Sequence, residues 1–131
     1  MLTDTQKKYL LAIYRLGNNG MRVRSTEVSD LLGVSKASTA KMSRRLIDDG
    51  YIEKAPYGSI TLTEQGIKAA NMLYTSQVVL CDFLEKRVGI PADTAEADSV
   101  TMVTDISEET VDKLVRYALG GRICPNGQAQ P

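Results

Sequence analysis

The sequence predicts a mainly α-helical chain that begins with a winged helix-turn-helix and ends with an all-helical domain. Three observations predict this fold class. Two short amphipathic segments flank a glycine turn, the second of them is rich in cations, and a strand-turn-strand follows at 51–62. That order of elements is typical of a winged helix-turn-helix. We expect residues 1–74 to form it, residues 75–119 to form the helical domain, which shares a long helix starting near 64, and residues 120–131 to be a disordered tail.

The first two helices are predicted from their caps and their apolar spacing. Thr3 and Gln6 have the spacing of a capping box, and apolar residues recur at helical intervals until Gly17. After turn residues at 18–20 and a link to residue 24, Ser25 is expected to cap a second helix that ends at Gly33. The apolar face of this second helix is expected to contain Val28, Leu31 and Leu32.

The third helix is the most informative segment. Ser35 is predicted to cap it, Val34 is expected to tuck into the core before it, and the helix should run roughly from Lys36 to Asp48. The inward residues are expected to be Thr39, Met42 and Leu46, and the outward set Lys36, Ala37, Ser38, Lys41, Arg44 and Arg45. Small residues near a helix start and cations along its face are typical of major-groove recognition. The alternative is a solvated cationic face.

A hairpin is predicted after the third helix. Residues 51–54 and 60–62 alternate as strands, and Pro56 to Ser59 supply the turn. This hairpin would be the wing. Near its tip, Lys54 and Tyr57 are expected to reach the DNA backbone or a minor groove, although Tyr57 could instead pack on its own hairpin.

Three helices are expected after the wing. The long helix should start at Thr63 and Glu64 and end near 87–89. A second helix should span about 92–104, with Pro91 marking its start in a position suited to the first helical residue. Ser107 should cap the last helix. Their apolar faces are expected to contain Ile67, Ala70, Leu73, Tyr74, Val78, Cys81 and Leu84 on the long helix, and Val111, Leu114, Val115, Ala118 and Leu119 on the last. With no partner sheet, these faces predict a homodimer. Two recognition helices would then lie ~34 Å apart or a multiple of it, on a palindromic operator.

Charge and composition favour a nucleic-acid partner and exclude several other classes. Residues 1–62 carry ten Lys and Arg against six Asp and Glu, and residues 63–131 carry six against ten, so only the front half is cationic. No leader and no apolar run of ~20 residues is present, so we expect a cytoplasmic protein with no membrane partner. An enzyme is not expected, because the chain has no His, no nucleophile motif and no phosphate-binding loop. A protein-interaction module, or a redox switch at Cys81 and Cys124, remains an alternative.

Several motifs resemble the metal-dependent repressors of the diphtheria toxin repressor and manganese transport regulator family, in its short two-domain form. They are Tyr9-x-x-x-Ile13-Tyr14, Arg24-x-x-x-Val28-x-x-Leu31-x-Val34-Ser35-x-x-Ser38-x-x-Lys41-Met42, the step 46–51, Leu62-Thr63-x-x-Gly66, and Phe83-Leu84 with Gly89. The similarity covers residues 4–119. It implies a winged-helix DNA-binding domain, a dimerisation domain, and a homodimeric repressor of metal-transport genes that binds operators with Mn²⁺ or Fe²⁺.

The chain departs from this family at the metal ligands. The resemblance aligns the ligand positions with Lys8, Leu11, Gln77, Val100, Val103 and Thr104. None is a good Mn²⁺ or Fe²⁺ ligand, and a one-residue shift would add only Asp98 or Asp105. We therefore expect no metal cofactor, and a regulator that is independent of metal or responds to a small organic ligand. The residues expected to contact double-stranded DNA are Arg24, Ser35, Lys36, Ala37, Ser38, Lys41, Arg44, Arg45, Lys54 and Tyr57.

Overall fold

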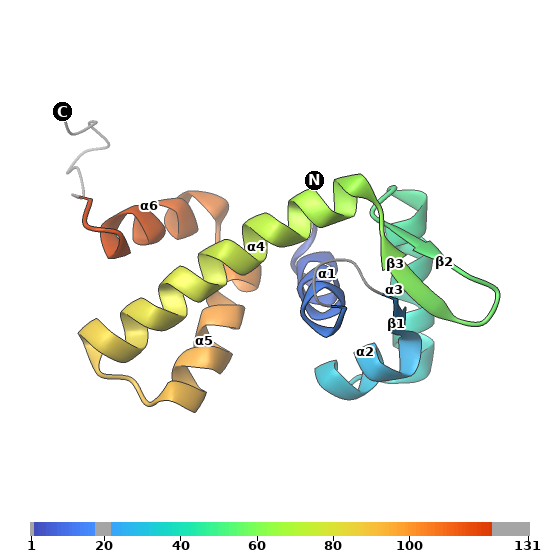
Figure 1. The fold of residues 1–131 in the computed structure, drawn as a ribbon, viewed down its shortest axis with the longest axis horizontal. Helices are drawn as coiled ribbons and strands as arrows, with labels where there is room; N and C mark the ends of the chain where they lie inside the picture. Colours follow the sequence, from blue (N-terminus) through green and yellow to red (C-terminus); the bar gives the residue numbers. More distant parts are fainter. Residues whose placement is uncertain (1, 18–21, 122–131) are drawn as a thin grey trace. The chain divides into compact units, whose positions relative to one another are not determined.

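The structure, a computed structural model, describes residues 2–17 and 22–121. The chain divides into two compact units, 1–74 and 75–131, and each is described by itself. Figure 1 shows the order of the elements. Among the described residues the fold is mainly helical with one small sheet, as the sequence predicts.

Unit 1 contains the helix-turn-helix and the wing. Its elements are α1 (Asp4–Leu16), β1 (Val23–Arg24), α2 (Ser25–Leu32), α3 (Lys36–Asp48), β2 (Ile52–Lys54), β3 (Ser59–Leu62) and the first part of α4 (Glu64–Phe83). The strands form an antiparallel sheet in the order β1-β3-β2. In Figure 1 the β2–β3 hairpin extends beside α3 as a wing. The core lies between the helices and the inner face of the sheet, where Leu10, Val28, Leu46 and Ile60 are fully buried.

The predicted boundaries of the first three helices hold closely. Thr3 and Gln6 form a full capping box at the start of α1. Gly33 takes the left-handed conformation with φ 66° between α2 and α3, as a turn of this kind requires. Ser35 caps α3 by accepting a hydrogen bond from the Ser38 amide. The helix-turn-helix is therefore set by local signals.

Four expectations for unit 1 were wrong. The link before α2 is a strand, β1, so the sheet has three strands where a two-stranded hairpin was expected. Arg24 is the N-cap of α2, and Ser25 is its first residue, because the Ser25 hydroxyl is used on the wing. Leu31 and Val34 are 52% and 37% exposed. Leu31 near the end of α2 and Val34 in the turn thus lie outside the core, whereas Ser43 on α3 is buried.

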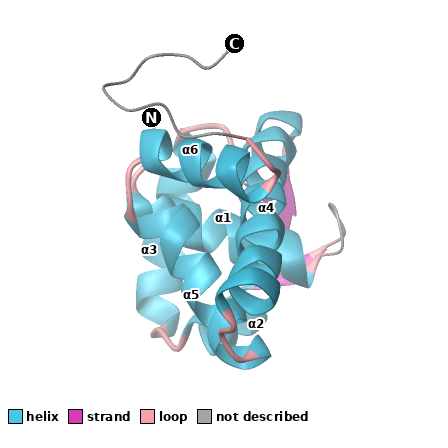
Figure 2. Cartoon of the chain, turned by 90° about the vertical axis from the view of Figure 1, so that its left-hand side faces the viewer, coloured by secondary structure: helices cyan, strands magenta, loops and turns pink. Residues whose placement is uncertain are grey.

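Unit 2 contains the end of α4 and two further helices. After α4 the chain forms one turn of π-helix, η1 (Leu84–Val88), ends it at Gly89 with φ 87°, and continues as α5 (Ala92–Asp105) and α6 (Glu108–Ala118). In Figure 2, which turns this side toward the viewer, α5 and α6 stand in front. Ser107 caps α6 as predicted, and Pro91 is the N-cap of α5, not its first helical residue. The expectation for the tail at 122–131 lies outside the described residues.

The predicted apolar faces of α4 and α6 are only partly buried. On α4, Ala70 and Leu80 are fully buried, but Ile67, Tyr74 and Val78 are 37–45% exposed. On α6 only Val111 is buried, and Leu119 beyond it is 72% exposed. Helical periodicity identified residues that share a face. It did not show that part of that face stays exposed among residues 2–17 and 22–121.

Candidate nucleic-acid interface

The outward face of α3 carries the cations that the sequence singled out. All ten residues expected to contact DNA are exposed. Lys36, Lys41, Arg44 and Arg45 lie on α3, with the small side chains of Ala37 and Ser38 in its first turn. None of these four cations forms an ion pair with a residue in the described part of the chain. Their charge is therefore available to a polyanion.

Polar contacts hold α3 at both ends, and the one near its start is buried. Near its start, the hydroxyl of Thr39 is hydrogen bonded to the hydroxyl of Ser29 on α2 at 2.8 Å, and both side chains are buried. At its end, the buried Gln6 amide on α1 donates to the Asp49 carboxylate at 2.7 Å. Buried polar groups that are fully paired hold a specific geometry, because any displacement leaves them without partners. The angle of α3 within unit 1 is thus set by α1 and α2.

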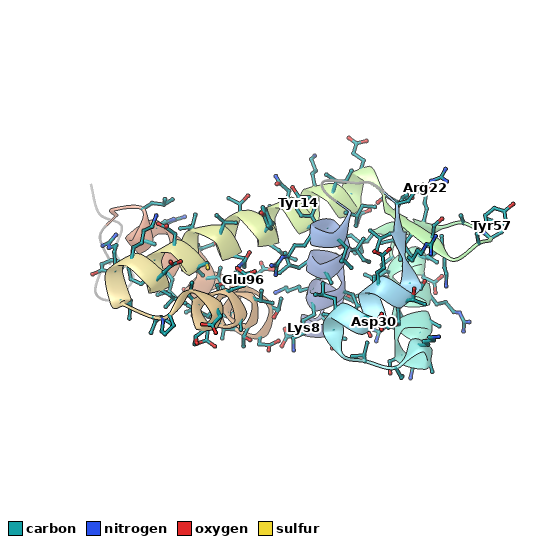
Figure 3. The ribbon with its side chains drawn as sticks, turned by 60° about the horizontal axis from the view of Figure 1, so that its bottom comes forward. Lys8, Tyr14, Arg22, Asp30, Tyr57 and Glu96 are labelled. Carbon is teal, nitrogen blue, oxygen red and sulfur yellow. The ribbon has the colours of Figure 1, made fainter. Side chains whose placement is uncertain are left out.

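The wing is joined to the start of α2. The backbone amide and the hydroxyl of Ser25 both donate to the Gly58 carbonyl, at 3.4 and 3.0 Å. Gly58 has φ 82°, a left-handed conformation that favours glycine. Tyr57 beside it is 96% exposed and points away from the chain (Figure 3), so its packing on the hairpin is excluded as an alternative. Lys54 is also exposed, at the end of β2.

A close backbone contact positions α4 against the wing. The Thr63 hydroxyl donates to the Gly50 carbonyl at 2.6 Å and accepts from the Gly66 amide at 3.0 Å. A Cβ at position 66 would collide with the carbonyl oxygen of Tyr51. This explains physically why Thr63 and Gly66 occur together in the motif at 62–66.

Arg22 was missed by the sequence analysis. It immediately precedes β1, is exposed, and lies beside the wing (Figure 3). Val23 between the two arginines is 1% exposed, and side chains alternate along a strand, so Arg22 and Arg24 share the outer face of the sheet. The alternation Arg-Val-Arg was the available signal, but two residues of strand are too few to identify one from sequence.

The positions that the resemblance aligns with the family's metal ligands can be described one unit at a time. In unit 1, Leu11 is 1% exposed and Lys8 is half-buried. In unit 2, Val103 is buried, Val100 is half-buried, and the Thr104 hydroxyl donates to the Val100 carbonyl at 2.9 Å. Over residues 2–17 and 22–121 there is no group of three or more His, Cys, Asp or Glu that could hold a metal ion. The side chains at these positions do not fit Mn²⁺ or Fe²⁺.

Gln77, the remaining aligned position, belongs to a hydrogen-bonded cluster inside unit 2. Gln77 is 2% exposed. Its side-chain amide nitrogen donates to the Ser99 hydroxyl at 2.9 Å and to the Glu96 carboxylate at 3.2 Å. The Cys81 thiol lies 3.7 Å from the same Glu96 carboxylate. Burial raises the pKa of Cys81, the Ser99 hydrogen bond lowers it, and the negative charge of Glu96 raises it further. A raised pKa keeps the thiol protonated, which is unlike the low-pKa thiols of redox sensors.

The lengths and apolar character of the described helices bear on membrane insertion. No helix in the described ranges is both long and apolar enough to cross a bilayer.

Comparison with known proteins identifies the family. Residues 1–60 match the iron dependent repressor, N-terminal DNA binding domain, and residues 63–131 match the iron dependent repressor, metal binding and dimerisation domain. An HTH-type transcriptional regulator of Methanocaldococcus jannaschii is 27% identical over 114 residues, which are 86% of this chain and 91% of that protein. The transcriptional regulator MntR of Escherichia coli O157:H7 is 34% identical over 89 residues, which are 68% of this chain and 57% of that protein.

A solved structure agrees on the fold. The crystal structure of IdeR from T. acidophilum superposes with a TM-score of 0.73 and 22% identity over all of this chain and 65% of that one. At this identity the likeness shows the fold alone. The two family matches together cover almost the whole sequence. The chain therefore belongs to the iron-dependent repressor family of transcriptional regulators.

Proposed function

We propose that this protein is a transcriptional repressor that binds a palindromic DNA operator as a homodimer and does so without control by Mn²⁺ or Fe²⁺. One observation carries the DNA-binding part. The exposed face of α3 presents four cations without ion-pair partners among the described residues, and one buried and one partly buried polar contact hold that helix. A rigid cationic helix with a small-residue start is suited to enter the major groove.

The residues divide into two roles. Lys36, Ala37, Ser38 and Lys41, on the first turns of α3 behind the Ser35 cap, are placed to reach base edges. The cations farther along and around them bind phosphates. These are Arg24, Arg44, Arg45 and Lys54, with Tyr57 at the tip of the wing. Phosphate contacts fix the register, and base contacts carry the specificity.

The proposed homodimer uses unit 2. The matched family domain is described as a dimerisation domain. Apolar side chains in the described part of unit 2, such as Val78, Val88 and Leu119, are 45–72% exposed. A two-fold dimer would place two α3 helices on half-sites about one DNA turn apart, or a multiple of it, and the operator would be palindromic.

Metal independence is supported by the donor set. Carboxylate and imidazole ligands are what Mn²⁺ and Fe²⁺ prefer, and the aligned positions offer an amide, a hydroxyl, an ammonium and aliphatic groups. The Gln77 amide and the Thr104 hydroxyl are already hydrogen bonded within unit 2. The Gln77–Ser99 hydrogen bond supports a protein whose α4 and α5 are held together without an ion.

The DNA-binding proposal is tested by selecting bound duplexes from random fragments and measuring affinity by fluorescence anisotropy. We expect the selected duplexes to contain a palindromic sequence. Lys41→Ala should either lower the discrimination at one base pair by ~1–3 kcal/mol, if Lys41 reads a base, or weaken all duplexes alike, if it binds phosphate. Lys68→Ala, at an exposed cation on α4, is the matched control and should have little effect. Failure of the wild-type protein to bind any duplex at low salt would refute the proposal.

Metal independence is tested separately. The operator affinity should be equal in buffer with Mn²⁺, with Fe²⁺ under anaerobic conditions, and with chelator. Isothermal titration should detect no micromolar binding of either ion. Micromolar metal binding that raises operator affinity would refute this part and leave the DNA-binding part intact.

A further inference from the structure

A hollow of about 610 Å³ opens between the start of α2 and the turn of the wing. Its lining is mixed and includes two cations, Arg22 and Arg24, together with Tyr57 and Ser59 of the wing. Arg24 is the register partner of Ser59 across the sheet. The size is within the usual range of ligand sites, ~300–1,000 Å³, but the lining suits an ionic group better than an apolar ligand.

We propose that this hollow seats a phosphate of the DNA backbone, on the duplex whose major groove α3 enters. The inference rests on the proposed DNA-binding function and deepens it, because it assigns a role to Arg22 and to the hollow. The wing is then docked by a phosphate held between Arg22 and Arg24. A contact of this kind positions the protein and carries no base sequence.

The charge of the hollow supports an anion. Neither guanidinium forms an ion pair with any residue over 2–17 and 22–121. Glu27 is the acidic residue in the lining, and its carboxylate accepts a hydrogen bond from the Arg24 backbone amide at 3.0 Å. The hollow is therefore lined by two arginine side chains and one carboxylate, and that carboxylate is already hydrogen bonded. Arginine binds phosphate oxygens in a bidentate manner, which makes it suited to a backbone phosphate.

The hollow is also pre-organised. The Ser25 amide and hydroxyl hold the Gly58 carbonyl, so the turn of the wing cannot move away from α2 without breaking both bonds. Arg22 and Arg24 flank the buried Val23, which anchors their strand in the core. The backbone that carries the two arginines is therefore already in place before binding, although their side chains still have to be ordered by the phosphate.

The first experiment compares Arg22→Ala with Arg116→Ala. Both arginines are exposed, but Arg116 lies on α6 in unit 2. On a selected operator and on a random duplex alike, Arg22→Ala should weaken binding about tenfold at low salt, as expected for a charge-assisted hydrogen bond. The slope of log K against log salt should become shallower by ~0.9, since one phosphate contact is lost. Equal behaviour of the two variants would overturn the inference.

The second experiment locates the phosphate. Operator duplexes are made with a single uncharged methylphosphonate at successive backbone positions. At one position in each half-site, neutralisation should weaken the wild-type protein and leave Arg22→Ala unaffected. If every position weakens both proteins equally, the hollow does not hold a backbone phosphate.

The third experiment should raise the affinity for DNA, whereas the first should lower it. Glu27→Gln keeps a side-chain acceptor for the Arg24 amide and removes the negative charge from the hollow, so DNA affinity should rise several-fold. Glu64→Gln, at an exposed carboxylate in the first turn of α4, is the control for net charge and should raise it less. An unchanged or lower affinity for Glu27→Gln relative to this control would contradict the inference.

Two further outcomes separate the possible causes of failure. If the wild-type protein binds duplex and Lys41→Ala weakens it while Arg22→Ala does not, the hollow is not used and the DNA-binding function stands. If equilibrium dialysis with inorganic phosphate shows tight binding that Arg22→Ala abolishes while duplex affinity is unchanged, the hollow takes a free anion. Either result overturns the inference.

Discussion

Units 1 and 2 differ in what they bury and what they expose. Unit 1 has a continuous apolar cluster from α1, the helix-turn-helix and the sheet. In the described part of unit 2, the buried apolar residues are few, and Gln77, Ser99 and Thr104 are buried beside them. The same unit exposes large apolar side chains on α4, on η1, on α6 and at the end of α6, namely Val78, Val88, Tyr117 and Leu119.

This difference shows where each unit obtains its stability. A set of helices and strands with its own apolar core can fold as a single chain, whereas exposed apolar side chains that share a surface indicate an interface. Unit 1 has the first property and presents a polar, cationic face. Unit 2 exposes large apolar side chains, which supports the proposed homodimer. The following variants are chosen to break this comparison or to sharpen it.

The largest effect is expected from a charge at an apolar site of unit 2. Val78→Glu should dissociate the proposed dimer, because burying an unpaired carboxylate is costly. Operator affinity should then fall by ~100-fold or more, since each half-site is bound alone. Sedimentation measures the loss of the dimer, and fluorescence anisotropy measures the operator affinity. Thr75→Glu, at an exposed polar site of α4, should leave both unchanged. A Val78→Glu dimer with normal affinity would place the interface elsewhere.

A core deletion in unit 1 should act on folding alone. Leu46 on α3 is fully buried, and Leu46→Ala should lower the free energy of unfolding by ~2–5 kcal/mol through lost transfer energy and a cavity. Urea denaturation measures it. Leu119→Ala, at a 72% exposed site, is the control and should change the unfolding of unit 1 very little. Similar losses for both variants would remove the distinction between the units.

The contact at Gly66 should be sensitive to a single methyl group. Gly66→Ala forces α4 away from the Tyr51 carbonyl and should cost ~1–3 kcal/mol of unfolding free energy. Gln65→Ala beside it, at an exposed site, is the control. Hydrogen exchange of the wing amides should speed up in the first variant only. Unchanged stability of Gly66→Ala would mean that the backbone relaxes there without cost.

A smaller effect is expected at the end of unit 2. The Arg87 guanidinium lies 5.1 Å from the Phe83 ring centroid and 5.7 Å from that of Tyr117, and donates to the Ala118 carbonyl at 2.9 Å. Arg87→Ala should therefore destabilise the packing of α6 by ~1 kcal/mol. Lys113→Ala, which removes an exposed ion pair with Glu109, should cost less. Thermal unfolding of unit 2 measures the stability lost in each of the two variants. Equal losses would contradict a stabilising contact of Arg87 with the two rings.

The smallest effect concerns Cys81 alone. Burial first and the Glu96 charge second keep its pKa above the usual range, so alkylation at pH 8 should be slow compared with an exposed thiol. In a Cys124→Ser background, Glu96→Gln should lower the pKa and speed alkylation. Glu85→Gln should do so less, because Glu85 is the weaker of the two influences. Iodoacetamide rates against pH measure this, and a faster reaction in Glu85→Gln would contradict it.

The sequence predicted the helix-turn-helix well because its signals are local. Ser35 as a cap and Gly33 and Gly50 as left-handed residues define α3 without any knowledge of the rest of the chain. The exposure of the six DNA-contact candidates on α3 follows from its helical periodicity. Their contacts with DNA remain predictions.

What could not be predicted depends on tertiary contacts. β1 exists because Val23 and Arg24 pair with Ile60 and Ser59, residues far along the chain. Gln77 is buried because Ser99 and Glu96 on another helix accept its hydrogen bonds, and no pattern within α4 shows this. The hollow beside Arg22 likewise arises only when the wing meets α2.

The hydrogen bond between Gln6 and Asp49 has a consequence for control of the protein. It joins the first turn of α1 to the residue that ends α3, and Tyr14 farther along α1 donates to Asn71 on α4. Displacement of α1 would therefore tilt α3 or break the Gln6 hydrogen bond. On the proposed function, we expect an effector that moves the N-terminal helix to change operator occupancy without touching nucleic acid itself.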